Sequence, residues 1–147
     1  MFDNTHIIHD GTVTASGYGQ VDASPVVINL GSGLTRMNVI LNISAIKISA
    51  DNEIYTVHVQ AGNNASFTKS LSLCSKELGH NSVLQGSLDS KISRVVLGCQ
   101  NEHGGTIFPY IRLRFVVAGT NPSITLSAFL HESLPERGWT SFATTTT

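Results

Sequence analysis

The chain has 147 residues, which is the usual size of one domain, and only 13% of them are charged, against about 25% in typical soluble domains. The formal net charge is −1 and the basic residues are scattered, which argues against nucleic-acid binding. No apolar run approaches the roughly 18 residues of a membrane span, so membrane association is not expected.

The low fraction of charged residues is made up by Ser, Thr, Asn and Gly, and this composition has two possible explanations. Small neutral polar groups are cheap to desolvate, so they suit broad packing against another protein. They are also common in any β-rich domain with many turns. The composition is compatible with both.

The N-terminal residues offer neither a targeting signal nor a strong metal motif. Residues 1–6 have no basic region followed by an apolar run, so we expect no signal peptide and synthesis in a cytoplasm. His6 and His9, with two aspartates nearby, have a spacing that could bind a metal weakly. Solvated polar residues are commoner near a chain end, and we expect no metal and no cofactor.

Alternation of apolar and polar residues dominates the rest of the chain and predicts strands, because successive side chains of a strand point to opposite faces. In 109–117, the clearest case, Ile111 and Leu113 lie on one face and Arg112 on the other. Residues 75–78 are the best helical candidate, at a single turn. The strands expected in chain order are 26–30, 39–46, 54–60, 67–73, 92–97, 109–117 and 124–131.

Turn signals separate these segments at the spacing of a β-sandwich or barrel. Residues 119–122, Gly-Thr-Asn-Pro, form a turn, so 109–117 and 124–131 are predicted to pair as an antiparallel hairpin. Residues 132–147 lack alternation and are predicted to be a tail. The sequence therefore predicts a single all-β domain of about eight strands over residues 1–131, with an N-terminal arm.

No catalytic motif stands out. Residues 31–33, Gly-Ser-Gly, are only a fragment of a nucleophile elbow, and residues 17–19, Gly-Tyr-Gly, lack the strand-to-helix context of a dinucleotide-binding loop. We expect no catalytic residues, so the chain is not expected to be an enzyme.

Cys74 and Cys99 form neither a metal-binding spacing nor a CxxC motif. Synthesis in a cytoplasm favours free thiols, and a free cysteine behaves as a small apolar side chain. Buried, inert thiols are the expectation, and a disulfide between them stays open because spacing alone does not decide it.

Several segments taken in order give the chain a family resemblance. The segments from residue 109 onward are the most specific when they are taken together. The matching segments are Ile-Asn-Leu-Gly at 28–31, the strand 55–60 leading to Ser-Phe-Thr at 66–68, Pro-Tyr-Ile-Arg-Leu-Arg at 109–114, 116–122 and 124–130. With these segments the chain resembles the small jelly-roll cement, or decoration, proteins of tailed-phage capsids. It departs from the family pattern at Asn29, where an acidic residue is usual, and in its longer C-terminal tail.

The resemblance implies a jelly-roll-like antiparallel β-sandwich without catalytic residues. It implies a virion protein that forms a homodimer or homotrimer and binds the outer surface of an icosahedral head, where it clamps neighbouring major capsid protein subunits. Assembly would take place in the host cytoplasm. The alternative is a ligand-binding β-sandwich, such as a carbohydrate-binding or tail-fibre module.

The candidate interface residues are apolar side chains outside the predicted strands, because exposed apolar groups mark interaction sites. Another interpretation is that the tail folds back and caps one end of the sandwich. The candidates, for contact with the capsid or with another subunit, are Phe2, Ile7, Ile8, Leu134, Trp139 and Phe142.

Overall fold

The computed structural model describes residues 7–47, 52–79 and 94–132, and these ranges contain strands and no helix. None of the described residues therefore belongs to a helix that is long and apolar enough to cross a membrane. The strands are β1 (Ile7–Val13), β2 (Gly17–Tyr18), β3 (Gln20–Val21), β4 (Ser24–Pro25), β5 (Ile28–Asn29), β6 (Arg36–Ile46), β7 (Ile54–Gly62), β8 (Ser70–Gly79), β9 (Arg94–Gln100), β10 (Glu102–His103), β11 (Thr106–Ile107), β12 (Tyr110–Ala118) and β13 (Ile124–Glu132).

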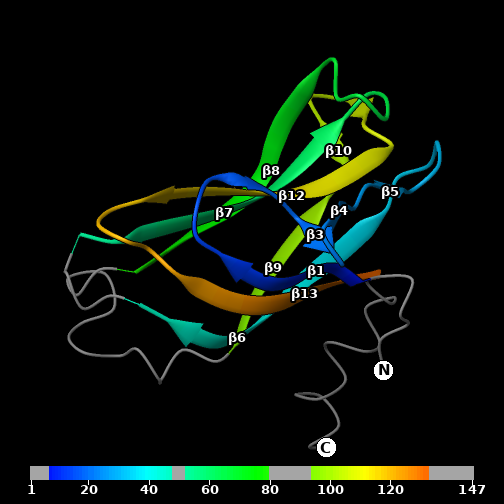
Figure 1. Ribbon diagram of the computed structural model, residues 1–147. Helices are drawn as coiled ribbons and strands as arrows, with labels where there is room; N and C mark the ends of the chain where they lie inside the picture. Colours follow the sequence, from blue (N-terminus) through cyan, green and yellow to red (C-terminus); the bar gives the residue numbers. More distant parts are fainter. Residues whose placement is uncertain (1–6, 48–51, 80–93, 133–147) are drawn as a thin grey trace, which may run out of the picture.

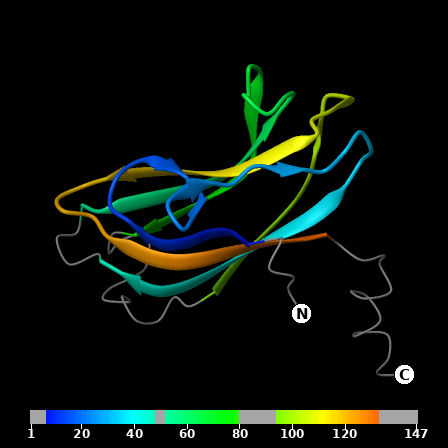
Figure 2. The ribbon, with the colours of Figure 1, turned by 45° about the vertical axis from the view of Figure 1, so that its right-hand side comes forward.

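Two main antiparallel sheets pack face to face (Figures 1 and 2). The first, here named sheet A, has the strand order β1-β13-β6-β9. The second, sheet B, has the order β2-β12-β7-β8, and β5 also pairs with β12. Figure 2 shows the two layers almost edge-on, with β1, β13 and β6 in one and β12, β7 and β8 in the other. The predicted all-β antiparallel sandwich is confirmed.

The pairing of strands is that of a jelly roll. The first strand pairs with the last, β1 with β13, and the next segment, the short strands β2 and β5, pairs with β12. Further in, β6 pairs with β9 and β7 pairs with β8. This is a long hairpin of paired strands rolled up so that its pairs alternate between two sheets, as in jelly-roll domains. Seven strands of the described chain are long, and the eighth is broken into the short strands β2 to β5.

The core lies between the sheets and follows the predicted alternation. On β12 the side chains of Ile111 and Leu113 are fully buried, while Arg112 between them points outward. Burying a side chain of this size contributes roughly 1.5–3 kcal/mol, so each alternating strand adds several such terms. The largest buried side chains include Tyr55, Phe115, Ile8, Met37, Leu41 and Leu113.

The predicted hairpin between residues 109–117 and 124–131 is wrong. β12 lies in sheet B and β13 in sheet A, so the turn between them crosses from one sheet to the other. Gly119, with φ of 113°, lets the chain pass so close to the backbone of Asn52 that a side chain there would collide with it. The Tyr55 hydroxyl accepts a hydrogen bond from the Ser123 amide (2.9 Å) and so ties the end of the crossing to sheet B. Alternation shows which face of each strand is buried. The pattern is the same whether two consecutive strands pair as a hairpin or lie in different sheets, so it could not decide between the two.

Two further local predictions need correction. Residues 75–78 are not a helical turn but belong to β8, where Leu78 pairs with Tyr55 and is buried. Residues 7–13, for which no strand was predicted, form β1 at the edge of sheet A. Alternation failed here because β1 contains a bulge between Ile7 and His9, which places Ile8 and His9 both on the inner side.

Candidate functional site

The outer face of sheet B carries an arginine held between two aromatic rings, here named the Arg112 stack. The Cζ atom of Arg112 lies 3.8 Å from the ring centre of Tyr18 and 3.9 Å from that of Phe67. Its Nε donates a hydrogen bond of 2.6 Å to Oε1 of Gln60, whose own side chain is 9% exposed. Stacking on aromatic faces and a fixed Nε donor hold the guanidinium in one orientation.

The loop between β7 and β8 positions Phe67. Oδ1 of Asn64 accepts hydrogen bonds from the amides of Ser66 (3.0 Å) and Thr68 (3.2 Å), which closes a tight turn. Phe67 takes a left-handed conformation, with φ of 54°, and its ring lies directly over Gly62. A Cβ atom at Gly62 would collide with that ring, so the glycine makes room for Phe67 to reach the arginine.

Positive charge gathers on the same face. Arg114 follows two residues after Arg112 on β12 and lies opposite His58 of β7. Burial disfavours the charged form and lowers the pKa of Arg112 from its usual range; Tyr18 opposes this shift, and the positive charge of Arg114 adds to it. Burial and Arg114 likewise lower the pKa of His58, whose Nδ1 lies 3.0 Å from Oγ of Ser72. Sheet B therefore presents cationic and hydroxyl groups around one half-exposed aromatic ring, that of Tyr18.

The outer face of sheet A is different: an apolar row crosses all four of its strands. Ile40 of β6 lies opposite Phe129 of β13 on one side and Val96 of β9 on the other. Phe129 in turn lies opposite Ile7 of β1. Val96 is 51% exposed, whereas Ile40 at the centre is 6% exposed. We name Ile7, Phe129, Ile40 and Val96 the apolar row.

The next row on this face is polar and keeps its charges at the edges. Asp10 of β1 lies opposite Ser127 of β13, and Asn42 of β6 lies opposite Arg94 of β9. Ser127 and Asn42 face each other at the centre. The two central strands are thus neutral in this row, and the charged residues lie on the two edge strands.

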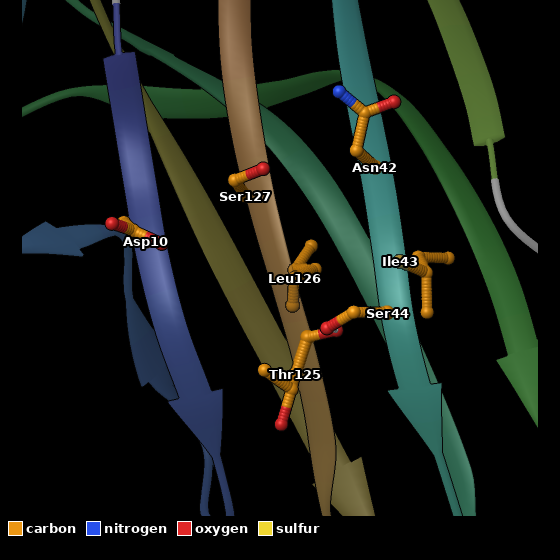
Figure 3. A pocket seen from close by; sticks show the side chains of 7 residues that line it. All are labelled: Asp10, Asn42, Ile43, Ser44, Thr125, Leu126 and Ser127. Carbon is orange, nitrogen blue, oxygen red and sulfur yellow. Dashed lines mark hydrogen bonds between the residues drawn. The ribbon is translucent and has the colours of Figure 1, made fainter.

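A shallow depression of about 210 Å³ lies beside these rows (Figure 3). It forms where the register of β13 against β6 shifts between Thr125 and Leu126, so that no residue of β13 lies directly opposite Ser44. The Thr125 hydroxyl lies 2.7 Å from that of Thr12, and Ser44 donates to the Thr125 carbonyl (3.2 Å). The depression is lined mostly by short polar side chains and has the open shape of a contact surface rather than of an enclosed pocket.

His9 is a core histidine. It is 4% exposed, and its ring meets that of Phe115 edge-on at 4.7 Å between centres. The amide of Gln20 donates to Nδ1 (3.1 Å), so the proton of the neutral ring is on Nε2, 3.3 Å from the Gly11 carbonyl. Burial lowers the pKa of His9. Within the described ranges no group of three or more His, Cys, Asp or Glu side chains could hold a metal, and His6 lies outside them.

The predicted interface residues have three different outcomes. Ile7 lies in the apolar row on the outer face of sheet A. Ile8 is fully buried between the sheets, so its prediction as an interface residue is wrong, because the bulge in β1 turns it inward. The other four lie outside the described residues, and their prediction stays a prediction: Phe2, Leu134, Trp139 and Phe142.

Sequence reasoning missed both groupings on the outer faces. Tyr18, Gln60 and Phe67 come from three separate segments, and only the outward position of Arg112 was readable from alternation. The apolar row left a weak signal: Ile40, next to Val39 and Leu41, breaks the alternation of its strand, so one of these residues had to face outward.

No known family model and no curated protein sequence matches this chain. Among solved structures it is similar to a xylan-binding module of the CBM15 type, at 16% identity and a TM-score of 0.39, over 86% of this chain and 93% of that one. It is also similar to Xylanase10C from Cellvibrio japonicus in complex with xylopentaose, at 16% identity and a TM-score of 0.36, over 86% of this chain. This chain spans 28% of that xylanase chain. Similarity at this level carries no conclusion about ligand or activity.

Proposed function

We propose that this chain is a non-catalytic structural protein of a phage virion that binds other proteins through the outer face of sheet A. In this proposal it acts as a cement protein: it oligomerises and packs on the outside of an icosahedral head, where it clamps neighbouring major capsid subunits. The observation that carries the proposal is the apolar row and the polar row next to it, which is neutral on the two central strands and charged only on the two edge strands.

That arrangement matches the anatomy of a protein interface, which is depleted of charge at its centre and polar at its rim. Val96 leaves about half of its surface in water, and Ile7 and Phe129 are only partly covered. Isolated exposed apolar residues are normal, but here Ile7, Phe129 and Val96 lie in register on one face with the nearly buried Ile40 between them, and a grouping of this kind marks interaction sites. The jelly-roll topology and the family resemblance of the sequence add to the proposal, since capsid proteins commonly use this fold.

The test uses heads assembled from a tailed-phage major capsid protein. Purified protein is mixed with heads that lack it, and the bound fraction is measured by sedimentation and electron microscopy. The proposal predicts saturable binding at regular positions on the outer surface. Heads that stay bare at concentrations far above those used in assembly would contradict it.

The Arg112 stack favours a second candidate function, carbohydrate binding on the outer face of sheet B. Sugars are bound by an exposed aromatic ring beside polar donors, and here Tyr18 is 41% exposed next to the guanidinium of Arg112. Among the described aromatic residues Tyr18 is the one with a widely exposed ring, which makes this candidate the weaker of the two. A glycan array with the wild type and with Tyr18→Ala tests it: binding that the variant loses supports a sugar site, and an array without binding rejects it.

A further inference from the structure

The two cysteines lie on the strands that close one side of the sandwich. β8 is the edge strand of sheet B and β9 the edge strand of sheet A, and the two strands contact each other. On β8, Cys74 lies opposite Val59, which is fully buried, and on β9, Cys99 lies opposite Met37, which is 1% exposed. Residues opposite each other in a sheet share a face, so both cysteines point inward, into the same core.

The two thiols meet there. Each thiol is the largest influence on the pKa of the other, and each side chain is partly exposed rather than sealed in the core. The hydrogen bond from Cys99 stabilises the thiolate of Cys74 and lowers its pKa, whereas the same bond and burial raise the pKa of Cys99 well above its usual range. Cys74, with the lowered pKa, is the thiol expected to attack first.

We propose that Cys74 and Cys99 form a redox-active pair, which a disulfide-bearing small molecule of the glutathione class converts into a disulfide that joins the edges of the two sheets. The inert thiols expected from the sequence are one state of this pair. The inference is independent of what the outer faces bind, so its test and the capsid-binding test can fail separately.

The reaction balances as thiol–disulfide exchange. The Cys74 thiolate attacks one sulfur of oxidised glutathione, forms a mixed disulfide and releases the other half as glutathione thiolate, which takes up a proton. Cys99 then loses its proton and its sulfur attacks the Cys74 sulfur, which releases the second glutathione. Two protein thiols are oxidised to one disulfide, and one oxidised glutathione is reduced to two thiols.

The bond would close a loop of about 25 residues and would restrict the unfolded chain. It would also fasten the two sheets to each other along the side on which β8 and β9 meet. We expect the oxidised protein to melt about 10 °C above the reduced protein.

The test treats the purified full chain with oxidised glutathione at mildly alkaline pH. We expect the protein to lose both free thiols and the mass of two hydrogen atoms, and a proteolytic digest to contain one peptide pair joined through Cys74 and Cys99. Reduction should restore both thiols and the lower melting temperature. Two retained thiols, stable glutathione adducts without an internal bond, or a bond between two chains would overturn the proposal. An internal bond that left the melting temperature unchanged would overturn the fastening role.

Single variants test the order of events. Cys99→Ser should stop at a stable glutathione adduct on Cys74, because the second attacking sulfur is missing. Cys74→Ser should likewise stop at a single glutathione adduct, now on Cys99, because the sulfur at position 74 is missing. Failure of Cys99→Ser to take up glutathione on Cys74 would contradict the assignment of Cys74 as the first attacking thiol.

Discussion

The two outer faces of this jelly roll come from the same alternation and yet differ in chemistry. On sheet B the outward side chains of β12 and β7 include Arg112 and Gln60, which lie beside aromatic rings. On sheet A the outward side chains of β13 and β6 include Phe129 and Ile40, with neutral polar groups beside them. Polar outward residues are what solvent requires of a sandwich, so sheet B needs no partner to explain it, whereas the apolar row does.

The two faces also differ in whether their side chains find all their contacts within the chain. The Arg112 stack is complete within the chain, because the guanidinium already has a ring on each of two sides and a hydrogen-bonded amide. The apolar row is incomplete at its edge, where half of Val96 remains in water. Under the proposed function, partner binding therefore belongs to sheet A, and the stack on sheet B contributes local stability.

The largest effect is expected in the core that both faces share. Leu113→Ala should lower the free energy of unfolding by about 3 kcal/mol, because the side chain is fully buried and leaves a cavity. Arg112→Ala, one residue away on the outer face, should lower it by about 1 kcal/mol through the loss of the stack and of the bond to Gln60. Urea denaturation measures both. Equal losses would mean that the stack is as tightly packed as the core.

A somewhat smaller effect is expected at the base of the stack. Gly62→Ala should lower the free energy of unfolding by about 2 kcal/mol, since the new Cβ atom would collide with the ring of Phe67. Gly33→Ala is the matched control, because no atom lies within 4 Å of a Cβ placed there. The double variant Gly62→Ala with Arg112→Ala should lose less free energy of unfolding than the sum of the losses in the two single variants. Losses that add fully would show that Gly62 does not act through the Arg112 stack.

A pH dependence should come from His9. Its folded pKa is lowered by burial, while in the unfolded chain it is about 6.5. Between these two values the unfolded state binds more protons, so stability is complete above about pH 6.5 and is lost as the pH falls toward the folded pKa. Protonation of Nδ1 would also remove the bond from the Gln20 amide.

Denaturation at about pH 7.5 and about pH 5 should therefore show a smaller difference for His9→Gln than for the wild type. His103→Gln, at an exposed position, is the control and should keep the wild-type difference. An unchanged difference in His9→Gln would assign the pH dependence to other groups.

How much of this was readable from the sequence depends on the distance between the residues involved. Alternation fixed the inward face of β12 correctly, because neighbouring residues carry that signal. It misplaced the partner of β12, because the choice between a hairpin and a crossing depends on contacts such as that of Gly119 with Asn52. The Arg112 stack could not be predicted either, since Tyr18 and Phe67 meet the arginine only after three segments have folded together.

The central claim is that the outer face of sheet A, and not that of sheet B, contacts the partner. Val96 and Val116 give a matched pair, one on each outer face, with 51% and 36% of their surfaces exposed. Changing either valine to Glu should alter the free energy of unfolding by less than about 0.5 kcal/mol, because the new charge stays in water in the isolated protein.

The decisive measurement is the affinity of the two variants for heads that lack the protein. Val96→Glu should weaken binding by at least about tenfold, because its charge would be buried unpaired against the partner. Val116→Glu should bind like the wild type. The opposite result, in which Val116→Glu loses binding and Val96→Glu keeps it, would contradict the account.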